Sequence, residues 1–185
     1  MNLAVEGAGA TTKQFKGLII VNTGNGKGKT TAALGVALRA CGYGMNVCML
    51  QFLKGKWKYG ELRSAPKLGT FEIRPMGQGF TWDSTDIEID KSKVREAWKA
   101  ATAEIQSGKY DVVILDEINY ALSYGFLPVE DVVNFLQKKP AMLHVILTGR
   151  DARPEVIEIA DMVTEMREIK HPFAEGIVGQ KGIEF

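Results

Sequence analysis

The length, composition and charge of the chain exclude several classes of protein. With 185 residues, of which 45% are apolar and 24% charged, the sequence suits one globular domain rather than a disordered or fibrous chain. A net charge of +1 gives no overall field toward nucleic acid or a membrane, and no apolar run reaches the roughly 18 residues of a spanning helix. We therefore expect a cytoplasmic protein, with no nucleic acid and no membrane as partner.

The first residues and the two cysteines bear on the cellular compartment. Residues 1–15 are mostly small or polar and lack the apolar core of a secretory signal. We interpret them as a flexible tail before a domain at 16–185. Cys41 and Cys48 do not have the CxxC spacing of a redox or metal pair, so we expect two free, buried thiols in a reducing compartment.

Strands and helices alternate along the chain. Short apolar runs predict strands at 17–21, 46–52, 71–74, 111–117, 142–147 and 162–168. Helical patterns are found at 30–39, 93–106, 128–137 and 154–160, whereas 53–69 and 75–90 read as irregular segments. This alternation predicts a single-domain α/β fold with a doubly wound, mainly parallel sheet and helices on both faces, of the P-loop NTPase-like (RecA-like) kind.

The stretch TGNGKGKTT at 23–31 lies between the first strand and the first helix. It fits the end of the phosphate-loop pattern G-x-x-x-x-G-K-[ST], although Thr23 replaces the first glycine. Glycines allow the backbone to approach phosphate, Lys29 supplies positive charge, and the hydroxyl of Thr30 suits Mg²⁺. We expect this loop to bind a nucleotide through Gly24, Asn25, Gly26, Lys27, Gly28, Lys29, Thr30 and Thr31.

Charged residues also follow two later strands. Asp116 and Glu117 end one apolar strand, where a carboxylate would lie beside the phosphate loop and hold Mg²⁺ together with Thr30. The sequence does not say which of the two acids contacts the metal. Arg150 follows another strand and would lie near phosphate.

Two further segments carry aromatic side chains. QFLKGKWKYGE at 51–61 interleaves lysines with aromatics, which suits single-stranded nucleic acid, another large flat anionic ligand, or a solvated loop. MGQGFTW at 76–82 holds Phe80 and Trp82 two residues apart, where they either pack on the core or serve a ligand. The residue types alone leave these alternatives open.

Taken in order, these segments resemble the ATP:corrinoid adenosyltransferases of the phosphate-loop type. The resemblance rests on TGNGKGKTT, QFLKGKW with Gly60-Glu61, MGQGFTW, LDEINYAL at 115–122, HVILTGR at 144–150, ADMVTEM at 160–166 and KHPFAEGI at 170–177. It covers roughly residues 16–185, and the ordered set is far more specific than any one segment.

The resemblance implies a transferase that moves the 5′-deoxyadenosyl group of ATP to the cobalt of a Co(I) corrinoid, in adenosylcobalamin biosynthesis or salvage. The cobalt attacks the ribose 5′ carbon, and inorganic triphosphate leaves from a nucleotide that lies in the loop in the reverse sense. Mg²⁺ accompanies ATP, a donor such as a flavoprotein supplies electrons, and a homodimer is expected. Complete cobalamin and its precursors are both open as the corrinoid substrate.

The resemblance also implies roles for individual residues. Lys29 and Thr30 would stabilise the departing triphosphate. Phe80 and Trp82 would close the lower face of the corrinoid, so that four-coordinate Co(II) is easier to reduce. Glu61 would help to fix the corrinoid or the nucleotide.

Considered without the resemblance, the residue types leave two other functions open. A phosphoryl-transfer NTPase or small-molecule kinase would use the same loop and acids, but it would make ADP and give Phe80 and Trp82 no role. A non-enzymatic, nucleotide-gated module would bind nucleic acid through 51–61 with a steep salt dependence. The near-neutral net charge weighs against that second alternative.

Overall fold

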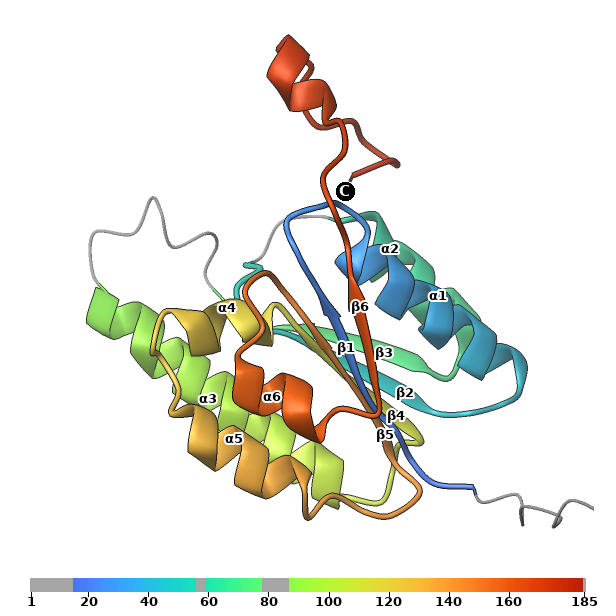
Figure 1. The fold of residues 1–185 in the computed structure, drawn as a ribbon. Helices are drawn as coiled ribbons and strands as arrows, with labels where there is room; N and C mark the ends of the chain where they lie inside the picture. The colour runs from blue at the N-terminus through green and yellow to red at the C-terminus, as the bar shows by residue number, and fades with distance from the viewer. Residues whose placement is uncertain (1–14, 56–58, 78–86, 185) are drawn as a thin grey trace, which may run out of the picture.

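The computed structural model describes residues 15–55, 59–77 and 87–184, which form one sheet between two layers of helices (Figure 1). The strand order is β3-β2-β4-β5-β1-β6, and all neighbouring strands are parallel. The strands are β1 (Ile19–Thr23), β2 (Val47–Gln51), β3 (Phe71–Pro75), β4 (Val112–Asp116), β5 (His144–Thr148) and β6 (Met162–Glu165). The predicted fold class is confirmed.

Helices cover both faces of this sheet (Figure 1). On one face lie α1 (Lys29–Gly42), α2 (Gly60–Ser64) and the 3-10 helix η1 (Ala65–Leu68). On the other lie α3 (Ile87–Gln106), α4 (Ile118–Ser123), α5 (Val129–Leu136) and α6 (Pro154–Ile159). A second 3-10 helix, η3 (Pro172–Glu175), belongs to the segment after β6. Among the helices in these described ranges, none is long and apolar enough to cross a bilayer.

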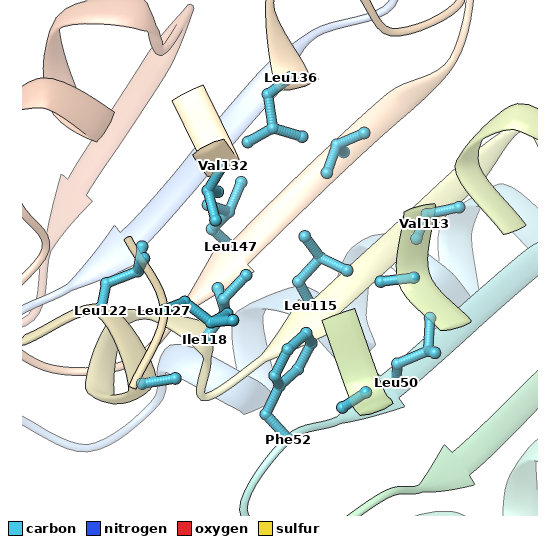
Figure 2. Close-up of a cluster of buried hydrophobic side chains, with 14 of the residues drawn as sticks. Leu50, Phe52, Val113, Leu115, Ile118, Leu122, Leu127, Val132, Leu136 and Leu147 are labelled. Carbon is cyan, nitrogen blue, oxygen red and sulfur yellow. The ribbon is translucent and has the colours of Figure 1, made fainter. Parts of the chain in front are cut away.

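Burial explains why the central strands are apolar throughout. The residues of β2 and β4 are all buried, because helices cover both faces of these strands. Figure 2 shows the larger cluster, in which Phe52 lies near Leu115 of β4, and Val132 of α5 lies beside Leu147 of β5. At the sheet edge the pattern is different, since all four residues of β6 are exposed.

Three details differ from the sequence predictions. Residues 60–68 form α2 and η1 rather than a loop, and α4 follows β4 directly; these elements are too short to show a periodic pattern. Helix α3 begins at Ile87, before the expected start at Lys93, because Glu88 and Asp90 suit the positive end of a helix. Cys41 and Cys48 are both free thiols, but only Cys48 is fully buried.

The topology brings the ends of three strands together. β5 pairs with β1 on one side and with β4 on the other, so that β5 separates the strand of the phosphate loop from the strand of the acids. The carboxyl ends of these parallel strands lie at the same edge of the sheet. Thr23, Asp116 and Thr148, which end β1, β4 and β5, therefore lie near one another.

Candidate active site

The phosphate loop connects β1 to α1. Gly24 and Gly28 have φ angles of 92° and 108°, which glycine adopts without strain. The ammonium group of Lys29 turns back into the loop and donates hydrogen bonds to the carbonyl oxygens of Gly24 at 2.8 Å and Gly26 at 2.6 Å. Burial lowers the pKa of Lys29 below its ordinary value. The loop therefore holds a positive charge that is largely removed from water, at the N-terminus of a long helix.

The segment after β6 packs against the outer side of this loop. The amide of Gly26 donates to the carbonyl of Met166 at 2.7 Å, and the amide of Met166 donates to the carbonyl of Thr23 at 2.8 Å. A Cβ atom on Gly24 would lie 2.5 Å from the carbonyl oxygen of Met166, and one on Gly26 would lie 2.7 Å from the backbone of Arg167. Two of the loop glycines are thus required by packing against the segment after β6.

Thr23 is the position at which the sequence departs from the general phosphate-loop pattern. Its side chain is buried, and its hydroxyl oxygen accepts a hydrogen bond from the amide of Ala152 at 3.1 Å. This bond ties the start of the loop to the segment that follows β5. The departure from glycine therefore has a structural reason in this chain.

Asp116 is the centre of a buried polar network. Its Oδ1 accepts hydrogen bonds from the hydroxyls of Thr30 and Thr148, both at 2.8 Å. Its Oδ2 lies 3.2 Å from Nζ of Lys54 and accepts from Nε2 of Gln51 at 3.3 Å. The carboxylate has no exposed surface. The structure thus brings Thr30 into contact with Asp116, one of the two acids that the sequence analysis expected beside it.

Glu117 lies next to this network in an unusual backbone conformation. It precedes α4 with a φ angle of 64°, and its amide donates to the hydroxyl of Thr148 at 2.9 Å. Burial raises the pKa of Glu117 to about 7, and the negative charge of Asp116 adds to the effect. A left-handed non-glycine residue and a shifted pKa are both typical of functional sites.

Several buried oxygens at this edge lack a hydrogen-bond partner. Within the described ranges, these are Oε1 of Gln51, Oε2 of Glu117 and Oδ1 of Asn119. Buried polar atoms are normally paired. Unpaired oxygens at the carboxyl ends of parallel strands indicate that this region accepts a ligand with cations or hydrogen-bond donors.

The oxygen atoms of this region suit Mg²⁺, an ion that protein side chains need not surround completely. Mg²⁺ prefers oxygen ligands and usually keeps water or phosphate oxygens in its shell. Where the structure describes side chains, no three His, Cys, Asp or Glu residues are grouped as a complete metal site. The protein would therefore supply only a few ligands, and a triphosphate and water would supply the others.

Lys54 and Glu61 extend the network toward α2. Nζ of Lys54 lies 3.3 Å from Oε1 of Glu61 and 5.0 Å from the centre of the Tyr59 ring. Nε2 of Gln51 also approaches Glu61, at 3.5 Å. The predicted site residue Glu61 is thus linked to Asp116 through the side chains of Gln51, which ends β2, and Lys54, which follows it.

The other predicted residues lie at the margin of the site or outside the described residues. Asn25, Lys27 and Thr31 are exposed, and Nζ of Lys27 forms an ion pair at 2.7 Å with Glu184. Arg150 is exposed as well, but it is close enough to contribute to the pKa shifts of other site residues. Phe80, Trp82 and residues 56–58 fall outside the described ranges.

Sequence reasoning missed three polar residues of this network. Gln51 and Thr148 each end an otherwise apolar buried strand, and Asn119 lies in α4 behind them. All three are completely buried. A polar residue that closes an apolar run at a strand's carboxyl end is the signal that could have found Gln51 and Thr148.

Known proteins resemble this chain over nearly its whole length. Residues 15–185 match the family described as ATP:corrinoid adenosyltransferase BtuR/CobO/CobP. The chain is 46% identical over 179 residues to a corrinoid adenosyltransferase of Sinorhizobium sp, covering 95% of this chain and 84% of the relative. It is 43% identical over 176 residues to the enzyme of that name from Escherichia coli K12, with 95% and 89% covered. The same shares are covered in the alignment with the corrinoid adenosyltransferase CobA of Salmonella typhimurium, at 40% identity. The chain therefore belongs to the ATP:corrinoid adenosyltransferase family.

Proposed function

We propose that this chain transfers the 5′-deoxyadenosyl group of ATP to the cobalt of a Co(I) corrinoid, and that its phosphate loop holds the triphosphate as it leaves. Family membership supplies ATP and a corrinoid as substrates. The observation that carries the assignment of residues is the hydrogen bond between Thr30 and Asp116, which joins the phosphate loop to the buried carboxylate.

The loop residues would stabilise the charge that develops on the leaving group. Lys29 now donates to two loop carbonyls, and it would exchange these for triphosphate oxygens when ATP binds. A desolvated ammonium and the free amides of a helix N-terminus act most strongly on charge that appears during bond breaking. No general base is required, because the nucleophile is the cobalt of the substrate. The phosphoryl-transfer and nucleic-acid alternatives are not favoured by the family assignment.

Mg²⁺ is part of the proposal. Thr30 and Asp116 would hold the ion, with Glu117 beside them. When bound, it would neutralise part of the charge of the departing triphosphate. The unpaired oxygens of Gln51 and Glu117 support this assignment.

The corrinoid would lie over the segment that leads from β3 to α3. Met76 donates its amide to the carbonyl of Gln51 at 2.9 Å, and Gly77 donates to the carbonyl of Lys54 at 3.1 Å. These bonds anchor the start of the segment beside the Asp116 network. We propose that Phe80 and Trp82, which follow directly in sequence, close the lower face of the corrinoid.

The same proposal includes a second copy of the chain, an electron donor and a reducing compartment. A second copy of the chain would cover apolar side chains that are exposed on β6 and after it, such as Met162, Val163, Ile169 and Phe173. A donor such as a flavoprotein would supply the electron that produces Co(I). The two free cysteines suit a reducing compartment such as the cytoplasm.

Product analysis tests the proposed reaction. The protein is incubated with ATP, Mg²⁺ and a chemically reduced corrinoid without oxygen, and the phosphate products and the light sensitivity of the corrinoid are measured. Inorganic triphosphate and a photolabile adenosyl-corrinoid are expected. ADP with an unchanged corrinoid would show that the loop transfers a phosphoryl group instead.

A further inference from the structure

Lys54 bridges two carboxylates that come from different elements. Its ammonium group lies 3.2 Å from Oδ2 of Asp116, which ends β4, and 3.3 Å from Oε1 of Glu61 in α2. The side chains of Lys54 and Glu61 are only 12% and 14% exposed, and that of Asp116 is not exposed at all. The ring of Tyr59 lies 5.0 Å from the same ammonium. Lys54 is therefore enclosed by two negative groups and an aromatic face.

The contacts of Lys54 pair it with both carboxylates at once. The two ion pairs, at 3.2 Å and 3.3 Å, lie where almost no side-chain surface is exposed, so each carboxylate has the same ammonium as its counter-charge. Without the ammonium, the hydrogen bonds described for the two carboxylates would come from neutral donors alone: the amide of Gln51 for both, and the hydroxyls of Thr30 and Thr148 for Asp116. Removing one partner of a buried ion pair leaves an uncompensated charge, which is strongly unfavourable. The carboxylates thus require a cation even when no ligand is bound.

We propose that Lys54 is an internal counter-cation, which balances Asp116 and Glu61 before ATP binds and thereby prevents free Mg²⁺ from occupying the site alone. This inference rests on the proposed function, because it concerns the carboxylate that would meet Mg²⁺ there. Mg²⁺ would enter only together with triphosphate, whose negative charge adds to that of the carboxylates. Lys54 acts through Asp116 and is a positioning residue rather than a catalytic one.

Thermal unfolding in the absence of nucleotide tests this role. Wild type and Lys54→Met are melted in EDTA and in millimolar Mg²⁺, at matched ionic strength. In EDTA the variant should melt about 6 °C or more below wild type, because a buried charge pair has been broken. Mg²⁺ should restore about half or more of this loss, because it can now bind the uncompensated carboxylates. Wild type should shift by less than about 1 °C.

A matched control separates loss of a counter-charge from loss of any buried lysine. Lys139 is also partly buried, but among the residues that the structure describes its ammonium donates to carbonyl oxygens alone, including those of Gly17 and Leu143. Lys139→Met should lower the melting temperature without any response to Mg²⁺. A second variant, Lys54→Met/Asp116→Asn, should lose the response because the carboxylate that attracts the ion is gone.

Three outcomes would overturn the proposal: Mg²⁺ stabilising wild type as much as Lys54→Met, no Mg²⁺ response in Lys54→Met, or a response unchanged in the double variant. If Lys54→Met does not fold, the melts use Lys54→Met/Glu61→Gln instead, which removes one buried charge of each sign. The melting temperature of this variant must still rise more with Mg²⁺ than that of wild type. These melts contain no ATP or corrinoid, so their result is independent of the product analysis that tests the reaction.

Discussion

Two lysines at opposite ends of the sheet make the same kind of contact. At the carboxyl end, Lys29 donates to the carbonyl oxygens of Gly24 and Gly26. At the amino end, Lys139 donates to those of Gly17 at 2.7 Å and Leu143 at 2.8 Å. Burial lowers the pKa of both. Judged by their bonds alone, the two residues would be assigned the same role.

The surroundings of Lys29 and Lys139 differ. Lys29 begins a 14-residue helix and lies one residue before Thr30, which contacts Asp116. Lys139 bonds to the two chain segments that lead into β1 and β5, and it follows the C-terminus of α5 rather than beginning a helix. The comparison teaches that a lysine bonded to carbonyls is a candidate for phosphate binding only where other groups also prepare an anion site.

The largest expected effect tests the carboxyl end. Lys29→Ala should lower kcat/KM for triphosphate release by about 10²–10³-fold, because the loop loses its charge on the leaving group. The melting temperature should fall by about 3–8 °C, as for any lysine that leaves two carbonyls without their donor, and the variant should remain folded at the assay temperature. Rates of triphosphate release and thermal melts measure both quantities. Normal turnover would remove Lys29 from the proposed site.

The next test concerns the segment after β3 at the same end of the sheet. Phe80→Ala should slow the reaction that starts from Co(II) corrinoid at least about tenfold more than the reaction from pre-reduced Co(I), because only the former requires the lower axial ligand to be displaced. Parallel assays with both forms give the ratio. Equal losses would contradict the role proposed for Phe80.

The amino end should respond in stability rather than in rate. Lys139→Met leaves the carbonyls of Gly17 and Leu143 without their charged donor, so we expect a loss of about 3–8 °C in melting temperature. Turnover below the transition should stay within about twofold of wild type. A large drop in turnover of the folded variant would show that the two ends of the sheet are coupled.

A smaller effect should follow from the strained acid beside the network. The pKa of Glu117 is raised from 4.5 to about 7 in the folded state. Between pH 4.5 and 7 the folded state therefore binds more protons than the unfolded state. The free energy of unfolding falls as the pH rises through this range, because Glu117 ionises in a buried position. Glu117→Gln cannot ionise. It should therefore melt about 1–3 °C above wild type at pH 8, with the gain disappearing toward pH 4.5.

The control for this test is Glu96→Gln, which neutralises an acid on the surface of α3 that pairs with Lys93. It should show no pH-dependent gain, because exposed ion pairs contribute little. A Glu117→Gln variant that is less stable than wild type at pH 8 would mean that the charged form is stabilised by contacts that outweigh its burial.

The sequence predicted most of the fold because apolar strands and long helices leave strong periodic patterns. It also predicted that the phosphate loop and the acid pair Asp116/Glu117 lie at the same edge, since parallel strands place their carboxyl ends there, but it did not say which acid meets Thr30. It did not predict α2 or α4, which have five and six residues and depend on packing rather than on pattern. Nor could it place Gln51 opposite Asp116, because that pairing depends on the register between β2 and β4.

The position of β1 has a consequence for how the protein is made. This strand is the first to leave the ribosome, yet its two neighbours are β5 and β6, the last strands of the chain. Contacts between residues so distant in sequence form late and slowly. Affinity for nucleotide should therefore appear only after β5 and β6 have been made, so a chain cut before β5 would not sequester ATP.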